Sequence, residues 1–379
     1  MDAPGLFSEL SSHMDLEPAE DVGCHKITSG SKDLYISQAA LPNGKRIRLL
    51  KTLLTSACER NCYYCPFRAG RDFHRVTFSP DQMAQSFSQI HQSHLADGIF
   101  LSSGVAGGGV RTQDRLLATA ELLRSKYQYR GYLHLKIMPG AEQAQIEQAM
   151  RLADRVSLNL EAPNSQRLAA LAPHKTFLEE LLNPLRTVQA IRSSKPSYLG
   201  WNQRWPSITT QFVVGAVGES DLELLSTTAL LNKEIGLSRA YFSAFSPIEG
   251  TPLEDLPPGS PKRQQRLYQA SFLLRDYGFD LEELPFDPSG NLPFQKDPKT
   301  AWAEIHLKDQ PVEINQADRT TLLRLPGIGP KSAAAILATR RQNRIQSVED
   351  LQKAGINPWR ALPYILLSGK RPLQQLRFW

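Results

Sequence analysis

Cysteine is scarce in this chain, and long apolar runs are absent from it. The 379 residues contain four cysteines, too few for the disulfide framework of a small secreted protein. No apolar run approaches the roughly 18 residues that a membrane helix needs. Residues 1–20 lack the basic and then apolar pattern of a signal peptide. These absences argue against a membrane or disulfide-stapled protein, and they predict a cytoplasmic protein without a membrane partner.

Most of the sequence has no excess of positive charge. The whole chain carries a formal net charge of +6 and has a pI near 9.1. Residues 311–379 contain eleven Lys or Arg and four Asp or Glu, a net charge of +7, so the rest of the chain is at −1. A polyanionic partner is therefore expected for the C-terminal segment and not for the body.

Three of the four cysteines, Cys58, Cys62 and Cys65, stand close together. Three neighbouring thiols cannot pair as disulfides without leaving one over, and no second Cys/His pair follows to complete a zinc site. Three thiolates suit a [4Fe–4S] cluster in which one iron has no protein ligand and can bind a second molecule. An incomplete zinc knuckle and unrelated surface thiols are the alternatives. Cys24 is expected to be a separate packed or exposed thiol.

From about residue 45 the chain alternates between strand-like and helical patterns. Strands are expected at 47–54, 98–103, 131–138, 155–161, 208–214 and 239–245, and helices at 80–95, 112–126, 141–152, 176–192, 220–235 and 261–277. This alternation predicts a parallel, right-handed α/β architecture, either an open sheet or a partial barrel. The cysteine segment follows the first strand, at the carboxyl end, where barrel active sites lie.

Several of these strands carry polar side chains, although parallel strands buried on both faces are usually continuously apolar. His134 and Lys136 alternate with leucines in the third strand, as do Ser157, Asn159 and Glu161 with apolar residues in the fourth. Residues two apart face the same side of a sheet. The pattern predicts a wet barrel interior that binds a ligand. The structural alternatives are a hydrogen-bonded His134 and a buried Lys136–Glu161 ion pair.

The spacing Cys-x3-Cys-x2-Cys, with Tyr64 directly before the last cysteine, resembles the signature of radical S-adenosylmethionine (SAM) enzymes. The resemblance implies that Cys58, Cys62 and Cys65 bind a [4Fe–4S] cluster and that its free iron binds SAM, with Tyr64 near the adenine. It also implies an external electron donor, such as flavodoxin or ferredoxin. SAM would then be cleaved to methionine and a 5′-deoxyadenosyl radical that abstracts hydrogen from a substrate.

Further segments resemble the same family, which implies a partial (β/α)6 TIM-like barrel. Residues 98–104 stand where the family carries a Gly-Gly-Glu-like segment, here without the glutamate. Residues 215–219, Gly-Ala-Val-Gly-Glu, resemble its Gly-x-x-Gly-Glu segment near the adenine, and residues 245–252 resemble the end of its sixth strand. The expected SAM contacts are Tyr64, Ser102, Ser103, Gly104, Lys136, Asn159, Glu161, Gly215 and Gly218.

The basic C-terminal segment contains a glycine hairpin, Pro-Gly-Ile-Gly-Pro, at residues 326–330. Asn315 is expected to cap a helix that runs to about Leu325, and Pro330 suits the first turn of the next helix. The segment resembles the helix-hairpin-helix module of DNA repair and competence-type DNA receptor proteins, in which backbone N–H groups bind phosphate. The expected DNA-binding residues are Gly327, Ile328, Gly329, Lys331, Ser332, Arg340 and Arg341.

The alternative is a plain helical hairpin without a ligand. A second, degenerate hairpin is expected at residues 354–356, between helices at 347–353 and 359–367.

Taken together, the two parts resemble the DNA modification or repair radical SAM proteins. The expected organisation is an irregular N-terminal extension at 1–44, the barrel at 45–280, a linker at 281–310 and an all-α helix-hairpin-helix domain at 311–379. The predicted function is a radical SAM enzyme that acts on double-stranded DNA, with the substrate bond left open. The alternatives are a radical SAM enzyme that modifies RNA or tRNA, and a DNA-binding protein with a structural or redox-sensing cluster.

Overall fold

The computed structural model of the chain describes residues 10, 21–29, 32–40, 44 and 46–372. The chain forms two compact units. The barrel unit comprises Met1–Glu219 with Leu230–Ser260, and the C-terminal unit comprises Ser220–Ala229 with Pro261–Trp379. None of the described helices is long and apolar enough to cross a membrane.

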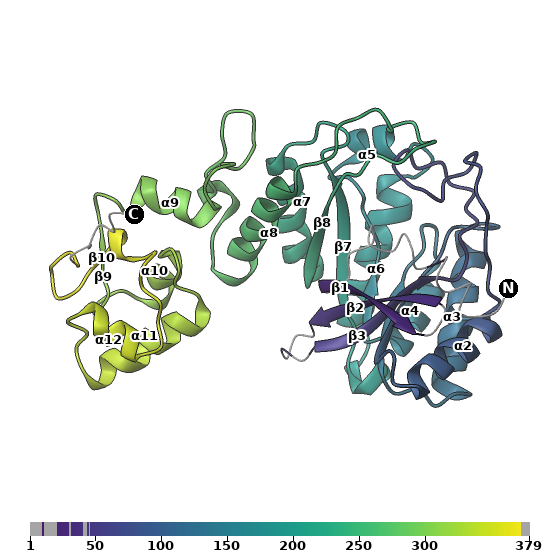
Figure 1. The fold of residues 1–379 in the computed structure, drawn as a ribbon, viewed down its shortest axis with the longest axis horizontal. Helices are drawn as coiled ribbons and strands as arrows, with labels where there is room; N and C mark the ends of the chain where they lie inside the picture. Colours follow the sequence, from purple (N-terminus) through teal and green to yellow (C-terminus); the bar gives the residue numbers. More distant parts are fainter. Residues whose placement is uncertain (1–9, 11–20, 30–31, 41–43, 45, 373–379) are drawn as a thin grey trace. The chain divides into compact units, whose positions relative to one another are not determined.

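An eight-stranded sheet, with its strands in chain order, is the centre of the barrel unit (Figure 1). β1 (Asp21–Ser29), β2 (Lys32–Ala40) and β3 (Arg46–Leu53) pair antiparallel. From β3 onward each strand pairs parallel with the next: β4 (Gly98–Ser102), β5 (Tyr132–Lys136), β6 (Arg155–Ser157), β7 (Ser207–Val214) and β8 (Arg239–Ala244). The described residues of β1 and β8 do not pair, so the six parallel strands form the predicted partial barrel.

Helices follow the parallel strands as the alternating pattern predicts. They are α2 (Pro80–Gln92), α3 (Gly109–Ser125), α4 (Gln143–Leu152), α6 (Asn183–Ser194) and α7 (Asp221–Ile235), with an unpredicted α5 (Ser165–Leu171) and a π-helical turn (Phe177–Leu182) before α6. Capping residues fix where these helices begin. In α2, for example, Ser79 accepts from the backbone N–H of Gln82 at 3.2 Å, and the Gln82 side chain accepts from Ser79 N–H at 2.9 Å. This capping box satisfies two N–H groups that the helix leaves open.

The hairpin formed by β1 and β2 corrects the expectation of an irregular segment over residues 1–44. β2 pairs with β3 through Ile36 opposite Leu50, and Ile36 is buried. The segment has only a short alternating pattern, and β2 becomes a strand by pairing with β3, which follows it in the chain. Cys24 lies on β1 opposite Ser37, and its side chain is outside the described part of the structure.

The C-terminal unit is mainly helical and contains α8 (Pro261–Asp276), α9 (Pro298–His306), α10 (Arg319–Arg324), α11 (Pro330–Gln342) and α12 (Val348–Lys353). Two short strands, β9 (Val312–Glu313) and β10 (Ile365–Leu366), pair parallel. The range predicted as a linker contains α9, which Asp297 caps by accepting from Thr300 N–H at 3.1 Å. Trp302 of α9 is buried against Phe279, their rings 5.4 Å apart. Residues 281–310 are therefore packed structure.

Two details of the hairpin region differ from the expectations. Asp318, and not Asn315, caps α10, because its carboxylate accepts from Thr321 N–H at 2.7 Å. Asn315 instead bonds the backbone of Ile345, donating to its oxygen and accepting from its N–H at 2.9 Å each. Residues 359–367 do not form a continuous α-helix; they contain a turn, a short 3-10 helix with Pro363 inside it, and β10. The proline and the strand pairing explain this difference.

Candidate active site

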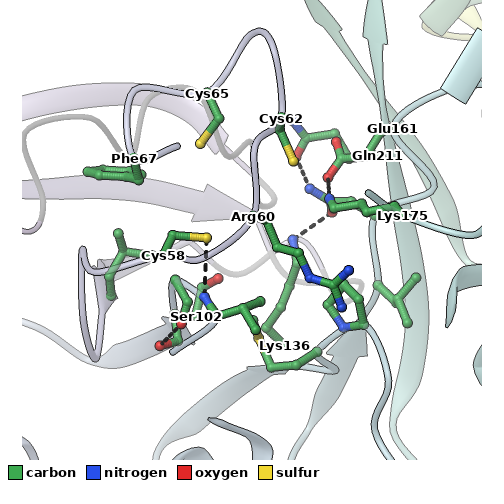
Figure 2. Close-up of a pocket in the computed structure, with 18 of the residues that line it drawn as sticks. Cys58, Arg60, Cys62, Cys65, Phe67, Ser102, Lys136, Glu161, Lys175 and Gln211 are labelled. Carbon is green, nitrogen blue, oxygen red and sulfur yellow. Dashed lines mark hydrogen bonds and ion pairs between the residues drawn. The ribbon is translucent and has the colours of Figure 1, made fainter. Parts of the chain in front are cut away.

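A cavity of about 120 Å³ lies at the carboxyl ends of the parallel strands. Cys58, Cys62 and Cys65 line it together, and Figure 2 shows their sulfur atoms facing a common space. The other lining residues expected from the sequence are Tyr64, Ser102, Ser103, Gly104, Lys136, Asn159 and Glu161. Residues far apart in the sequence meet here because parallel strands end at the same edge.

Close backbone contacts hold the cysteine loop against the end of β4. Glu59 N–H donates to Val105 O at 2.8 Å, and Val105 N–H lies 3.4 Å from Cys58 Sγ. A Cβ at Gly104 would lie 2.3 Å from Ala57 O. Glycine is therefore required at position 104, since any side chain would push the cysteine loop away.

Arg75 fixes the same loop from its other end. Its guanidinium donates at 3.0–3.2 Å to the carbonyl oxygens of Ser56, Phe67, Arg68 and Arg71. One side chain thus ties together the residues on both sides of the three cysteines. No sequence pattern indicates this role, because every residue has a carbonyl acceptor and only the fold brings these four together.

Glu161 has a strained backbone that directs its carboxylate into the cavity. Its φ is +66°, in the left-handed region, which costs a non-glycine residue on the order of 1–3 kcal/mol. Two bonds to β7 hold this conformation: Glu161 N–H donates to Gln211 O at 2.9 Å, and Val213 N–H donates to Glu161 O at 2.8 Å. The side chain is 3% exposed. Such outliers are characteristic of functional positions.

Glu161 is paired with Lys175, a residue that sequence reasoning missed. Lys175 Nζ lies 2.9 Å from Glu161 Oε1, whereas Lys136 Nζ donates to Asn159 Oδ1 at 2.6 Å. The ammonium groups of Lys136 and Lys175 both act on Glu161, so the buried charges form a larger group than the expected Lys136–Glu161 pair (Figure 2). Lys175 stands in a loop after α5 without any motif around it, so its place in the cavity depends on the fold.

The charges of this group stabilise one another. Burial by itself would raise the pKa of Glu161, but the ammonium groups of Lys175 and Lys136 lower it below its ordinary value. Burial would lower the pKa of Lys175, but Cys62, when it is a thiolate, and the Glu161 carboxylate raise it overall. At neutral pH the cavity therefore holds a carboxylate and an ammonium side by side.

The thiols fit a cluster better than a single metal ion. Burial raises the pKa of Cys62 and of Cys65, so both are neutral unless a cation stabilises the thiolate. No three His, Cys, Asp or Glu side chains in the described part of the chain are grouped to share one metal ion. Three cysteines spread around one cavity match an iron–sulfur cluster, whose thiolate ligands bind different irons.

Some predicted cofactor contacts lie elsewhere. Gly215 and Gly218 do not line the cavity. They have left-handed φ values of 96° and 70°, and the turn is closed by Glu219, which accepts from Gly215 N–H at 2.5 Å. His134 also lies outside the cavity, deeper in the barrel, and its Nε2 bonds Ser157 Oγ at 2.8 Å. Its surroundings match the structural alternative.

The predicted phosphate-binding hairpin has an exposed turn on a packed base. Gly327 is exposed with a φ of +80°, and Lys331 is exposed on the first turn of α11. The Ile328 side chain is buried, and its carbonyl oxygen accepts from Lys299 Nζ at 2.5 Å. Gly329 precedes α11 as its N-cap residue. Backbone N–H groups and a lysine thus gather at a helix start, the arrangement that suits an anion.

The remaining predicted contacts on α11 differ in their surroundings. Ser332 is half-buried and Arg341 is exposed. Arg340 donates through Nη1 to Ile314 O at 3.0 Å and to Ala317 O at 2.5 Å. Arg340 therefore ties α11 to the segment before α10, a structural role that the sequence analysis did not assign to it.

The chain thus combines a partial α/β barrel, in which three cysteines surround a cavity, with a helix-hairpin-helix module. Residues 308–358 match the family described as helix-hairpin-helix motif.

Two groups of curated relatives share part of the sequence. The tRNA-2-methylthio-N(6)-dimethylallyladenosine synthase of Lachnoclostridium phytofermentans is 25% identical over 203 residues, 52% of this chain and 41% of that protein. The threonylcarbamoyladenosine tRNA methylthiotransferase MtaB of Thermotoga maritima is 25% identical over 238 residues, 55% and 47% of the two chains. The chain spans less than half the length of these two relatives.

Solved structures with a similar arrangement are distant. The FeFe-hydrogenase maturase HydG of Carboxydothermus hydrogenoformans has a TM-score of 0.47 and 17% identity, covering 60% of this chain and 51% of its own. The coproporphyrinogen III oxidase HemN of Escherichia coli, a radical SAM enzyme, has a TM-score of 0.39 and 14% identity, with 59% and 51% covered.

Proposed function

We propose that this protein is a radical SAM enzyme that acts on a nucleic acid. The observation that carries the proposal is the convergence of Cys58, Cys62 and Cys65 with the strained Glu161 on one cavity at the carboxyl ends of six parallel strands. The sequence similarity to the tRNA methylthiotransferases supports it independently.

The chain's own residues provide the environment that this chemistry needs. The three cysteine thiolates would hold a [4Fe–4S] cluster, which, when bound, supplies the electron that cleaves SAM and yields a hydrogen-abstracting 5′-deoxyadenosyl radical. Glu161 and Lys175 offer adjacent charges of both signs to the zwitterionic amino-acid part of SAM. The cysteine loop packs against the chain that follows β4 at Gly104, and the two together form one wall of the cavity.

The substrate class is a nucleic acid, and RNA is favoured over the predicted double-stranded DNA. The helix-hairpin-helix match supports a phosphate-binding module, but phosphate contacts carry little information about bases. The two relatives that share about half of this chain are named for tRNA modification, which supports the RNA alternative.

Anaerobic reconstitution tests the enzymatic part. Single Ala substitutions at Cys58, Cys62 or Cys65 should abolish iron loading, whereas Cys24→Ala should load like the wild type. The reduced wild-type protein should form 5′-deoxyadenosine from SAM, quantified by chromatography. Equal loss of iron in Cys24→Ala would contradict the three-ligand site, and iron loading without any 5′-deoxyadenosine would favour a structural or redox-sensing cluster.

Matched substrates test the nucleic-acid part. The reconstituted protein is incubated with SAM and either total tRNA or duplex DNA, and the nucleosides are compared by mass spectrometry. The proposal expects a new nucleoside from RNA and faster 5′-deoxyadenosine formation in its presence. A new nucleoside from DNA alone would restore the DNA prediction.

A further inference from the structure

A second depression, of about 380 Å³, lies wholly within the C-terminal unit. Aromatic and charged side chains line it together: Arg266, Lys296, Asp297, Trp359, Arg360 and Tyr364. Its size is in the range of small-ligand sites. We call it the Trp359 groove. None of these residues belongs to the cysteine cavity, and the glycine hairpin does not account for them.

Trp359 presents its indole on a well-fixed turn. The side chain is 60% exposed, whereas the neighbouring Pro358 and Ala361 are buried. Ala361 N–H donates to Pro358 O at 2.7 Å, and Leu362 N–H donates to the same oxygen at 3.1 Å. A scattered exposed apolar residue needs no explanation. An indole held in the open by a rigid turn, beside cationic groups, has the features of a stacking platform.

The charge of the groove is positive. Arg266, Lys296 and Arg360 line it against one carboxylate, that of Asp297. Asp297 already caps α9, and it forms an ion pair with Arg360. Arg360 also donates to Thr300 Oγ1 at 2.9 Å, and both of these contacts use Nη2.

The net charge of the groove stays positive when Glu304 at its edge is counted, because three cations then stand against two carboxylates. Lys296 pairs with Glu304 at 2.7 Å at the edge of the groove, outside its lining. Arg360 is 60% exposed although it is paired with Asp297. A guanidinium that is anchored on one side and open on the other can contact a phosphate without first being ordered.

The groove begins at the turn of the first hairpin. A Cβ at Gly327 would lie 3.1 Å from Arg360 Cβ and 3.9 Å from Asn357 O. The exposed hairpin turn and the turn that carries Trp359 therefore lie side by side, with little room between them for a side chain at position 327. A strand whose phosphate is held at the hairpin could place a neighbouring nucleotide in the groove.

We propose that the Trp359 groove binds an unpaired nucleotide, with its base stacked on Trp359 and its phosphate beside Arg360 and Lys296. The inference rests on the proposed nucleic-acid function. It adds that the substrate has at least one unpaired nucleotide, either beside a double helix or in a loop. Stacking on an aromatic ring suits this role because every base has a π-face, while a base inside a duplex has both faces covered by its stacked neighbours.

Two probes test the proposal with the full-length chain. One is a blunt RNA duplex, and the other is the same duplex with a short 3′ overhang that carries 2-aminopurine. The wild type should bind the overhang probe more tightly and quench 2-aminopurine fluorescence. Trp359→Ala should lose roughly 5- to 150-fold in affinity for the overhang probe and all quenching. Trp359→Phe, which keeps a ring, should retain most of both.

Controls separate this site from the hairpin and from general exposure. Ile305→Ala, which removes a 69% exposed apolar side chain on α9 outside the groove lining, should behave as the wild type. Lys331→Ala should weaken binding of both probes equally. A preference for the overhang that survives Trp359→Ala would overturn the groove proposal while the hairpin site stands. A wild type that binds neither this RNA pair nor its DNA counterpart would overturn both proposals.

Discussion

Glu161 combines burial, charge and backbone strain at a single position. Its left-handed φ is maintained by two backbone bonds to β7, and its carboxylate lies 2.9 Å from Lys175. A residue held in this way by its surroundings is pre-organised, so little conformational entropy is lost when a ligand binds. A substitution at Glu161 is therefore the best single test of whether SAM binding can be lost while the cluster is kept.

Glu161→Gln should weaken SAM binding and leave iron loading unchanged. Glutamine keeps the shape but removes the charge, and hydrogen bonds to charged groups are worth about 1.5–3 kcal/mol, or roughly 10- to 150-fold in affinity. Equilibrium dialysis with SAM and the SAM-induced change in the EPR spectrum measure the effect. Asn159→Ala should act in the same direction.

Glu147→Gln is the matched control for this experiment. Glu147 pairs with Arg151 and Lys195, and none of these three residues lines the cavity, so its variant should bind SAM as the wild type does. Unchanged SAM affinity in both Glu161→Gln and Asn159→Ala would remove the end of β6 from the cofactor site.

Gly104→Ala should lower iron loading, although position 104 contributes no ligand. The added Cβ would lie 2.3 Å from Ala57 O and push the cysteine loop from its place. Iron content after reconstitution measures the effect, and Ser102→Ala, which adds no atom on the same strand end, is the control. Normal iron loading in Gly104→Ala would show that the loop can shift without losing the cluster.

Among the secondary-structure elements, α9 has a role that its position in the chain does not suggest. Lys299 reaches from α9 to the carbonyl oxygen of Ile328 in the glycine hairpin, and its ammonium lies 4.6 Å from the centre of the Tyr277 ring. A buried cation with backbone and aromatic partners supports the hairpin from below. The shape of the hairpin therefore depends on α9 as well as on its own two helices.

The burial of Lys299 predicts a pH-dependent stability. Burial lowers its pKa from 10.5 to about 7, whereas in the unfolded chain the pKa has its ordinary value. Between about pH 7 and 10 the unfolded chain binds more protons, so this group makes the folded state more stable as the pH rises. The free energy of unfolding of the wild type, relative to Lys299→Met, should therefore increase over this range in urea titrations.

Lys296→Met is the control for this prediction, because Lys296 is exposed just before the same helix. Its unfolding free energy should follow the wild type across the pH range. Parallel curves for the wild type and Lys299→Met would mean that Lys299 keeps its ordinary pKa in the folded protein.

At the scale of the whole molecule, chemistry and charge lie in different units. The cysteine cavity is lined only by residues of the barrel unit, and the basic excess is confined to residues 311–379. The proposed division gives catalysis to the barrel unit and nucleic-acid affinity to the C-terminal unit. Point substitutions test it better than truncation, because removal of residues 310–379 would uncover Trp302 and Phe279, over which Arg324 packs.

Lys331→Ala should weaken binding across unrelated nucleic-acid sequences and reduce the dependence of log affinity on log salt by about one unit, since each neutralised phosphate releases condensed counterion. Formation of 5′-deoxyadenosine without nucleic acid should not change. Arg340→Ala is the contrasting variant: it breaks bonds to Ile314 and Ala317 and should lower thermal stability. An unaltered salt slope in Lys331→Ala would exclude this lysine from the phosphate site.

The sequence by itself determined the features that local chemistry controls. The cysteine spacing, the Pro-Gly-Ile-Gly-Pro turn and the alternation of strands and helices depend on residues that are near neighbours in the chain, so periodicity and turn chemistry were sufficient to predict them. The approximate positions of the six parallel strands, and the meeting of the cysteine loop with Asn159 and Glu161, followed because parallel strands end at one edge.

Only the tertiary structure decided the features that depend on distant partners. Lys175 becomes a cavity residue because Glu161 faces it, and Arg75 donates to four carbonyl oxygens on both sides of the three cysteines. The surroundings of Arg340 and Trp359 also depend on the fold. Arg340 is held by hydrogen bonds within the unit, whereas Trp359 is exposed beside Arg360. The sequence around each of these residues does not indicate its partners, because the partners come from segments far apart in the chain that meet only on folding.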